Sequence, residues 1–296
     1  MGRALADAFP ICRDTFAEAD AALGEPLSAR CFDGPEDQLV LTENTQPAIL
    51  SVSIAAYRLL ASRGLSPRFV AGHSLGEYSA NVAAGTFSFA DAARIVRRRG
   101  RYMQEAVPVG TGAMSAILGL DAAKVEQACL EAADGDVVSP ANVNGGGQVV
   151  IAGSKDAVAR AGDRAKALGA KRVIPLPVSA PFHCALMKPA EERLAPELRA
   201  LAQHDPLVPI VANVDAEPKR TAREAIDALI AQVSAPVRWE QVVNRLASEG
   251  VTTYVEVGPG TVLSGLVRKI DRDARVLSCG VPGDLAALDV LMEVKR

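Results

Sequence analysis

A serine between two glycines is the feature of the sequence that most directly suggests chemistry. The segment Gly72-His73-Ser74-Leu75-Gly76 has the form Gly-x-Ser-x-Gly, which holds a nucleophilic hydroxyl at a tight turn between a strand and a helix. The apolar run 69–71 predicts the strand, and residues 75–84 predict the helix. The N–H of Leu75 then lies at the helix N-terminus, where it can stabilise an oxyanion. Taken alone, these residues also fit a glycine-rich turn with a capping serine.

A serine nucleophile needs a base, and the chain has three histidines. His73 is adjacent to Ser74, so its side chain should leave the backbone in another direction. His204 lies in a polar, turn-like segment. His183 follows a predicted strand and a proline and enters an apolar run, where it suits either a base or a buried core histidine.

Five arginines lie on one predicted helix, residues 89–105. Most of them fit a solvated basic face. They spread around the helix, however, so at least one is expected to point inward, where a guanidinium needs an anionic partner. A substrate carboxylate would suit this planar group through two parallel hydrogen bonds. The five are Arg94, Arg97, Arg98, Arg99 and Arg101.

The predicted elements that must position these residues indicate an α/β protein. Strands near 69 and 255 alternate with helices, which favours a parallel sheet with helices on both faces. From about residue 107 the pattern changes to strand, helix, strand, helix, strand, which predicts a small inserted α+β domain. Residues 1–35 predict an amphipathic helix with a loop at Gly34-Pro35.

Composition excludes several classes of protein. The chain has 296 residues, 49% of them apolar, and a net charge of −3, so a nucleic-acid binder is not supported. No apolar run reaches about 18 residues, and the first residues lack the apolar core of a signal peptide. Five cysteines without paired spacing predict reduced thiols in the cytoplasm, with no disulfide frame and no metal site.

A set of motifs resembles the malonyl-CoA:acyl carrier protein transacylases, and their order and spacing agree over essentially the whole chain. They are Thr-Glu-Asn-Thr-Gln-Pro-Ala at 42–48, Gly-His-Ser-Leu-Gly-Glu-Tyr at 72–78, Arg-Gly-Arg-Tyr-Met-Gln-Glu-Ala-Val-Pro at 99–108, Gly-Ala-Met at 112–114, Ala-Asn-Val-Asn at 141–144, Gly-Gln-Val-Val-Ile-Ala-Gly at 147–153, Val-Ser-Ala-Pro-Phe-His at 178–183, Pro-Val-Arg-Trp at 236–239 and Glu-Val-Gly-Pro-Gly at 256–260.

The resemblance implies two domains. An α/β-hydrolase-like large domain with a parallel sheet would comprise residues 1–106 and 183–296. A ferredoxin-like small domain, residues 107–182, would be inserted into it, with the active site in the cleft between them.

The resemblance also implies roles for individual residues. Ser74 would be the nucleophile, His183 the base, and Arg99 the group that binds the malonyl carboxylate. In this family a backbone carbonyl from the segment 236–239 orients the histidine, and we assign that carbonyl to Arg238.

Further residues are expected to line the substrate site. Asn142, Asn144 and Gln148 would lie near the substrate. Phe182 resembles the residue of malonyl-selecting members, because methylmalonyl-selecting relatives often have a smaller side chain there.

The implied activity is that of an [acyl-carrier-protein] S-malonyltransferase of fatty-acid synthesis. Malonyl would pass from malonyl-CoA to Ser74 and then to the phosphopantetheine thiol of acyl carrier protein, in a ping-pong scheme. The partners are therefore acyl carrier protein and a coenzyme A thioester, with no nucleic acid and no membrane. We expect a monomer that uses no cofactor, with malonyl-CoA as substrate.

The sequence departs from the family pattern at its start. Family members usually begin with a strand and a Phe-Pro-Gly-Gln-Gly-Ser-Gln loop, whose glutamine supplies a second oxyanion N–H. This sequence begins after that loop, so we expect the strand and the donor to be missing. Loss of one such donor costs on the order of 10²–10³ in turnover.

Two other functions fit parts of the sequence. A serine esterase or thioesterase would want an acid and then a late histidine, but none follows His204. An inactive, truncated relative that binds acyl carrier protein would fit the missing strand, although Ser74, His183 and Arg99 are intact.

Overall fold

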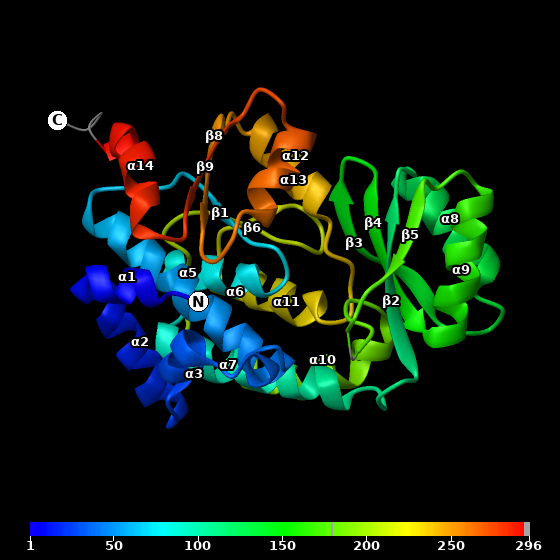
Figure 1. Cartoon of the computed structure of the whole chain (residues 1–296), viewed down its shortest axis with the longest axis horizontal. Coiled ribbons are helices and arrows are strands. Elements are labelled where there is room, and N and C mark those ends of the chain that lie inside the picture. The colour runs from blue at the N-terminus through cyan, green and yellow to red at the C-terminus, as the bar shows by residue number, and fades with distance from the viewer. Residues whose placement is uncertain (179, 293–296) are drawn as a thin grey trace.

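The computed structural model describes residues 1–178 and 180–292, and they form an α/β protein (Figure 1). The α-helices are α1 (Arg3–Ala8), α2 (Pro10–Leu23), α3 (Leu27–Asp33), α4 (Glu36–Leu39), α5 (Thr42–Ser62), α6 (Leu75–Ala83), α7 (Phe89–Glu105), α8 (Ala122–Ala132), α9 (Lys155–Ala167), α10 (Lys188–Arg199), α11 (Ala222–Gln232), α12 (Trp239–Ser248), α13 (Val262–Ile270) and α14 (Leu285–Met292), and two short 3₁₀ helices are η1 (Ala185–Met187) and η2 (Pro282–Asp284). The strands are β1 (Val70–Ala71), β2 (Gly112–Leu118), β3 (Val138–Gly145), β4 (Gln148–Ser154), β5 (Arg172–Pro175), β6 (Ile210–Val211), β7 (Pro218–Lys219), β8 (Thr253–Val257) and β9 (Arg275–Cys279).

A layer of helices forms the largest hydrophobic core. Helices α5 and α7 pack so closely that a Cβ added at Gly100 would lie 2.6 Å from the Cα of Glu43. Ser88 caps α7, because its hydroxyl accepts a hydrogen bond from the N–H of Asp91 at 3.0 Å. This cap fixes where α7 begins and therefore which of its side chains face inward.

The first 35 residues differ from the single amphipathic helix that the sequence predicts. They form three helices, α1, α2 and α3. Pro10 starts α2 after the extended residue Phe9, and Gly24 ends it with a left-handed backbone. Proline lacks the N–H that a continuous helix needs, and glycine adopts the left-handed conformation easily, so the predicted helix is divided at these points.

Parallel strand pairs lie beside the helical layer, as the sequence predicts, but in two separate sheets. Strand β1 pairs in parallel with β6, which pairs antiparallel with β7. Strand β8 pairs in parallel with β9. In the described part of the chain, no strand joins β1 to β8, so the predicted single sheet is not formed.

A four-stranded antiparallel sheet, in the order β3-β4-β2-β5, lies at one end of the molecule (Figure 1). Its chain order is β2, α8, β3, β4, α9, β5, with α8 and α9 on one face. These two helices and the sheet enclose a separate core that includes Ile117, Val125, Ile151 and Val158. The predicted strands and helices of this region are confirmed, with β3 as an additional strand.

Across residues 1–178 and 180–292, every helix is too short or too polar to cross a lipid bilayer.

Candidate active site

The turn between β1 and α6 holds Ser74 in a strained conformation. Its φ of 51° and ψ of −108° lie outside the regions that non-glycine residues usually adopt. Glycine is required at position 72, because a Cβ there would lie only 2.0 Å from the backbone carbonyl of Gly76. This geometry is that of a nucleophile elbow, which presents the serine hydroxyl away from the backbone.

The Ser74 hydroxyl is hydrogen-bonded to His183, which lies 109 positions later in the chain. Ser74 Oγ and His183 Nε2 are 2.7 Å apart, and His183 Nδ1 is 2.9 Å from the backbone carbonyl of Gln232. A carbonyl can only accept, so Nδ1 carries the proton and Nε2 is free to accept from the hydroxyl. The imidazole is therefore in the tautomer that a general base requires.

The structure corrects the prediction for the carbonyl that orients His183. It belongs to Gln232 and not to Arg238. Gln232 ends α11, where the last carbonyls have no partner within the helix. Arg238 instead precedes α12, and its carbonyl accepts the N–H of Val242 at 3.0 Å.

The His183 side chain is kept neutral by its surroundings. It is 3% exposed, and its backbone φ is 59°. Burial and the nearby charge of Arg99 lower the pKa of His183 to about 3, although the hydrogen bond to Gln232 acts in the opposite direction. At neutral pH the imidazole is unprotonated and able to take a proton from Ser74.

Arg99 is the arginine of α7 that points inward, as the sequence predicts for at least one of the five. Its side chain is 2% exposed and donates to Gln46 Oε1 at 2.7 Å, Gln232 Oε1 at 2.9 Å and Ser74 Oγ at 3.2 Å. Within the described residues, no carboxylate lies within ion-pair distance of it, and its Nε has no hydrogen-bond partner. A buried guanidinium without a counter-ion is suited to an anionic ligand.

The backbone on both sides of Ser74 is fixed by Asn213, a residue that the sequence analysis missed. Asn213 Oδ1 accepts the Ser74 N–H at 2.7 Å, and Asn213 Nδ2 donates to the Gly72 carbonyl at 2.7 Å. Asn213 follows β6, the parallel neighbour of β1. A polar residue directly after a buried strand is a signal that could have identified it, because such strand ends meet at one edge of a sheet.

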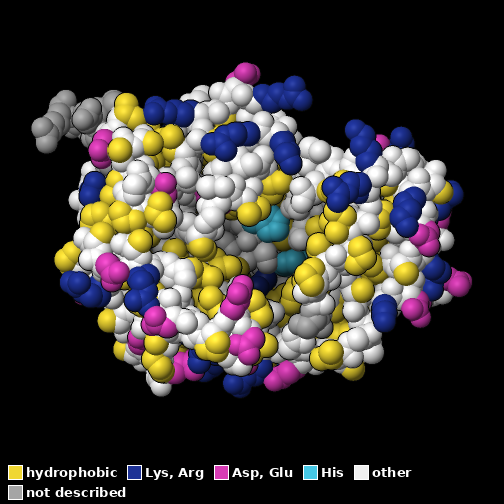
Figure 2. Space-filling view, viewed as in Figure 1, with side chains coloured by type: hydrophobic (Ala, Val, Ile, Leu, Met, Phe, Trp, Pro, Cys, Tyr) yellow, Lys and Arg dark blue, Asp and Glu magenta, His cyan; other side chains and the backbone are white. Residues whose placement is uncertain are grey.

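The antiparallel sheet contributes one wall of the site. Asn144 Oδ1 is 2.9 Å from His73 Nε2, and the His73 and Trp239 rings are 5.7 Å apart. Asn142, on the same strand, bridges to Val237 through its backbone. Figure 2 shows histidine side chains inside a central hollow, between surfaces rich in hydrophobic side chains.

The other predicted site residues, Leu75, Phe182 and Gln148, lie in three different parts of the structure. Leu75 is the first residue of α6, and Phe182 packs between the helical core and the core on the inner face of the antiparallel sheet. Ser179, in the motif that contains Phe182, lies outside the described residues. Gln148 lines a pocket with Leu120 and Glu240, and no contact with Ser74 is observed for it among the described residues.

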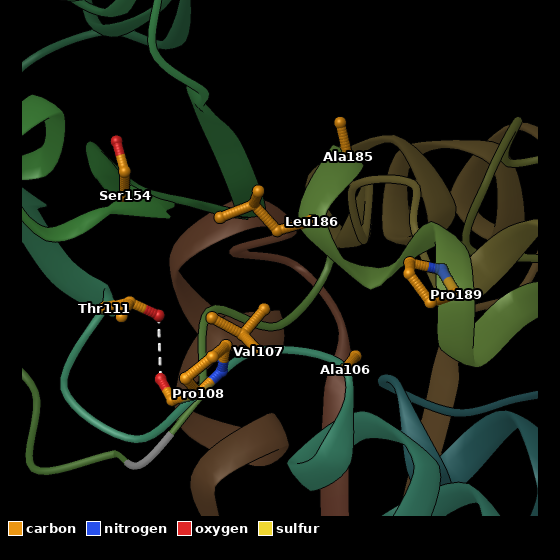
Figure 3. A pocket seen from close by; sticks show the side chains of 8 residues that line it. All are labelled: Ala106, Val107, Pro108, Thr111, Ser154, Ala185, Leu186 and Pro189. Carbon is orange, nitrogen blue, oxygen red and sulfur yellow. Dashed lines mark hydrogen bonds between the residues drawn. The ribbon is translucent and has the colours of Figure 1, made fainter.

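An apolar pocket of about 410 Å³ lies where α7, β2 and η1 meet (Figure 3). Its side chains come from Ala106, Val107, Pro108, Thr111, Ser154, Ala185, Leu186 and Pro189. The Thr111 hydroxyl donates to the Pro108 carbonyl at 2.7 Å, so this polar group is already paired. The lining contains no titratable group, so we assign no chemistry to this pocket.

All five cysteines are buried free thiols. Burial raises the pKa of each one, to about 11 or 12, so these thiols are protonated at neutral pH. Among the residues that the structure describes, no group of three or more His, Cys, Asp or Glu side chains could hold a metal ion.

Known proteins are similar to this chain in sequence and in fold. Residues 1–285 match the family model of the acyl transferase domain. The chain is 52% identical over 284 residues to the malonyl CoA-acyl carrier protein transacylase of Escherichia coli (strain K12), covering 96% of this chain and 92% of that protein. The enzyme of the same name from Bacillus subtilis (strain 168) is 47% identical over 283 residues, with 95% and 89% covered.

Solved structures give the same result. An acyl carrier protein S-malonyltransferase from Vibrio cholerae superposes with a TM-score of 0.95 at 47% identity, covering 97% of this chain and 94% of that one. A malonyl-transacylase solved in complex with a type II polyketide acyl carrier protein has a TM-score of 0.94 at 48% identity, covering 97% and 93%. The chain therefore belongs to the acyl transferase family and, within it, to the malonyl-CoA:acyl carrier protein transacylases.

Proposed function

We propose that this protein transfers malonyl from malonyl-CoA to the phosphopantetheine thiol of acyl carrier protein, for use in fatty-acid synthesis. The observation that carries the proposal is the convergence of an imidazole and a guanidinium on the hydroxyl oxygen of Ser74. Ser74 Oγ lies 2.7 Å from His183 Nε2 and 3.2 Å from Arg99 Nη2. A hydroxyl, a neutral imidazole and a guanidinium without a counter-ion are the parts needed to transfer an acyl group that ends in a carboxylate.

The first half of the reaction acylates Ser74. His183 Nε2 takes the hydroxyl proton as Oγ attacks the thioester carbonyl, and the Leu75 N–H at the start of α6 stabilises the oxyanion. The carbonyl of Gln232 holds the imidazolium in place. The C–S bond then breaks, and coenzyme A leaves as a thiol with the proton from His183.

The second half regenerates the serine. The phosphopantetheine thiol of acyl carrier protein gives its proton to His183 and attacks the malonyl-serine ester. Collapse of the tetrahedral intermediate breaks the ester bond, and Ser74 Oγ recovers the proton from His183. Because two acceptors follow one another at one nucleophile, the kinetics are expected to be ping-pong.

Arg99 selects the malonyl group in this scheme, through hydrogen bonds to its free carboxylate. Asn142, Asn144 and Phe182 form the wall that faces the acyl group, with Phe182 limiting its size. The structure gives less support to Gln148, which lines a different pocket with Glu240.

The domain division supports a site of this kind. We propose an α/β-hydrolase-like domain from residues 1–106 and 183–296, and a ferredoxin-like domain from residues 107–182. The strand order β3-β4-β2-β5, with a helix after β2 and another after β4, is consistent with the ferredoxin-like arrangement.

We further propose a monomer that works in the cytoplasm and uses no cofactor besides its thioester substrate. The five free thiols fit a reducing compartment.

Replacement of the nucleophile tests the proposal. Wild-type protein mixed with malonyl-CoA should release a burst of coenzyme A and gain the mass of one malonyl group on Ser74. Ser74→Ala should abolish both signals, whereas the exposed serine variant Ser248→Ala should retain them. Malonyl on another residue would remove Ser74 from the mechanism. Release of free malonate as fast as coenzyme A would show a thioesterase instead.

A further inference from the structure

A buried carboxylate next to the nucleophile has no part in the mechanism above. Glu77 lies three residues after Ser74 in the first turn of α6, and it is 1% exposed. At this position a glutamate often bonds the N–H of the cap residue, in a capping box. Here the Ser74 N–H donates to Asn213 instead, so the Glu77 side chain is free to bond other elements.

Glu77 holds two residues that contact the catalytic groups. Its Oε2 accepts the backbone N–H of Asn213 at 2.9 Å and the Nε2–H of Gln232 at 2.8 Å. Asn213 in turn bonds the backbone on both sides of the nucleophile, at the Ser74 N–H and the Gly72 carbonyl. A change at Glu77 is therefore transmitted to the serine turn.

Gln232 connects the remaining groups of the site. Its Oε1 accepts from Arg99 at 2.9 Å, its Nε2 also donates to the Ser74 carbonyl at 2.9 Å, and its backbone carbonyl accepts from His183. The amide has only one orientation that satisfies both Glu77 and Arg99. A carboxylate accepts and a guanidinium donates, so Nε2 must face Glu77 and Oε1 must face Arg99.

The same amide separates the Glu77 carboxyl group from the Arg99 guanidinium. Direct contact between Glu77 and Arg99 would balance the charge of the guanidinium. It would also occupy the N–H donors that, in the proposed function, bind malonyl. With Gln232 between them, Arg99 has no carboxylate partner in the part of the chain that the structure describes, yet it is held by an oriented acceptor. A neutral bridge thus allows a buried guanidinium to be positioned and still remain available.

We propose that Glu77 is a positioning residue that acts through Gln232 and Asn213 to place Arg99, and that it thereby sets the preference for malonyl over uncharged acyl groups. This inference rests on the proposed function. Loss of the Glu77 acceptor would leave the Ser74 carbonyl as the main acceptor for the Gln232 amide N–H, and the hydrogen bond that directs Arg99 would be weakened.

The test compares three proteins, the wild type, Glu77→Leu and Glu77→Gln, in single-turnover acylation by malonyl-CoA and by acetyl-CoA. Intact-protein mass measures each acylation rate. The ratio of the two rates does not depend on the fraction of folded protein, so a purely structural role would leave it unchanged. We expect Glu77→Leu to lower the malonyl-to-acetyl ratio by about tenfold, the effect of one lost bond to a charged group. Glu77→Gln, whose amide oxygen can accept both bonds, should recover most of the ratio.

An unchanged ratio in Glu77→Leu would overturn the inference. If that variant does not fold, Glu77→Asp replaces it, because the shorter side chain keeps the charge but withdraws the oxygen from Gln232; it should lower the ratio too, and a wild-type ratio would have the same negative meaning. A wild-type protein that malonyl-CoA does not acylate would overturn the proposed function and this role together, whereas normal acylation with an unchanged ratio would overturn only the role of Glu77.

Discussion

The arginines on the two sides of helix α7 have opposite surroundings. On the outer side, Arg94, Arg97, Arg98 and Arg101 each pair with a carboxylate, in partly exposed ion pairs. On the inner side, Arg99 is held by two amide oxygens and a hydroxyl. An exposed ion pair contributes little to stability because water and salt screen it. A buried cation that lacks an anion costs free energy, and under the proposed function a bound substrate carboxylate would recover this cost.

The largest expected effect on activity comes from removal of His183, the proposed base, which shares Ser74 with Arg99. His183→Ala should slow acylation of Ser74 by about 10²–10⁴-fold, because no other described group lies within hydrogen-bond reach to accept its proton. Quenched-flow measurement of the malonyl-serine ester would show this loss. A variant with nearly wild-type rates would mean that the hydrogen bond between His183 and Ser74 is structural and not catalytic.

The contrast between the two sides of α7 is tested most directly by a matched pair of arginine variants. Arg99→Ala should raise the barrier to malonyl transfer by about 2–5 kcal/mol and spare acetyl transfer, because only malonyl presents a carboxylate to the guanidinium. Arg98→Ala, which removes the ion pair with Glu197, should change neither. The measurement is kcat/KM for both thioesters, and equal losses for malonyl and acetyl in Arg99→Ala would contradict the carboxylate role.

The stability of the protein should depend on pH through Glu77, the buried carboxyl group that Gln232 separates from Arg99. Burial raises the pKa of Glu77 from its ordinary value of 4.5 to about 7, against hydrogen bonds from Gln232 and Asn213 that lower it. The folded state therefore binds the proton more tightly than the unfolded state does. The stability that this provides is complete below pH 4.5 and is lost as the pH rises through 7.

Glu77→Gln removes this titration and should gain on the order of 1–3 kcal/mol of stability relative to the wild type between pH 4.5 and pH 8. Urea unfolding of both proteins at the two pH values measures the change. Burial also lowers the pKa values of His183 and His73, but both histidines are present in each protein, so their effects cancel in the comparison. Parallel pH profiles would show that Glu77 does not titrate in this range.

The smallest effect belongs to the outer side. Glu197 accepts hydrogen bonds from Arg98 and Tyr102, and the Arg98 side chain is 51% exposed. Glu197→Ala should therefore destabilise the fold by no more than about 1 kcal/mol, and high salt should reduce the difference further. Thermal unfolding at low and high salt measures it. A loss that survives high salt would place this outer pair in the same class as the buried contacts.

Much of the local structure could be predicted from the sequence because it depends on neighbours in the chain. Ser88 and Asp91 mark the start of α7, and the predicted end at Glu105 agrees with the structure. The alternation of strands and helices in the antiparallel region is likewise a local pattern. The single helix predicted for residues 1–35 was wrong. Pro10 and Gly24 interrupt the helix there, although the apolar periodicity continues on both sides of them.

The site could be predicted only where a side-chain type reveals its function. Three patterns can be recognised in the sequence: a serine between glycines, a histidine after a proline and a cluster of arginines. The carbonyl that holds His183 leaves no such trace, since every residue has one, and its identification required the end of α11 to be placed in space. Gln46 and Gln232 were missed as ligands of Arg99 for a related reason, because a glutamine in a helix usually faces solvent.

The positive φ values of Ser74 and His183 connect reactivity to the integrity of the whole chain. Neither residue would keep such a conformation in a loosened molecule, since only complete surroundings can impose it. The amount of protein that malonyl-CoA acylates should consequently equal the amount that is fully folded. A partly unfolded chain should lose its reactivity toward malonyl-CoA before it loses its helices. The nucleophile can thus serve as a built-in reporter of tertiary order.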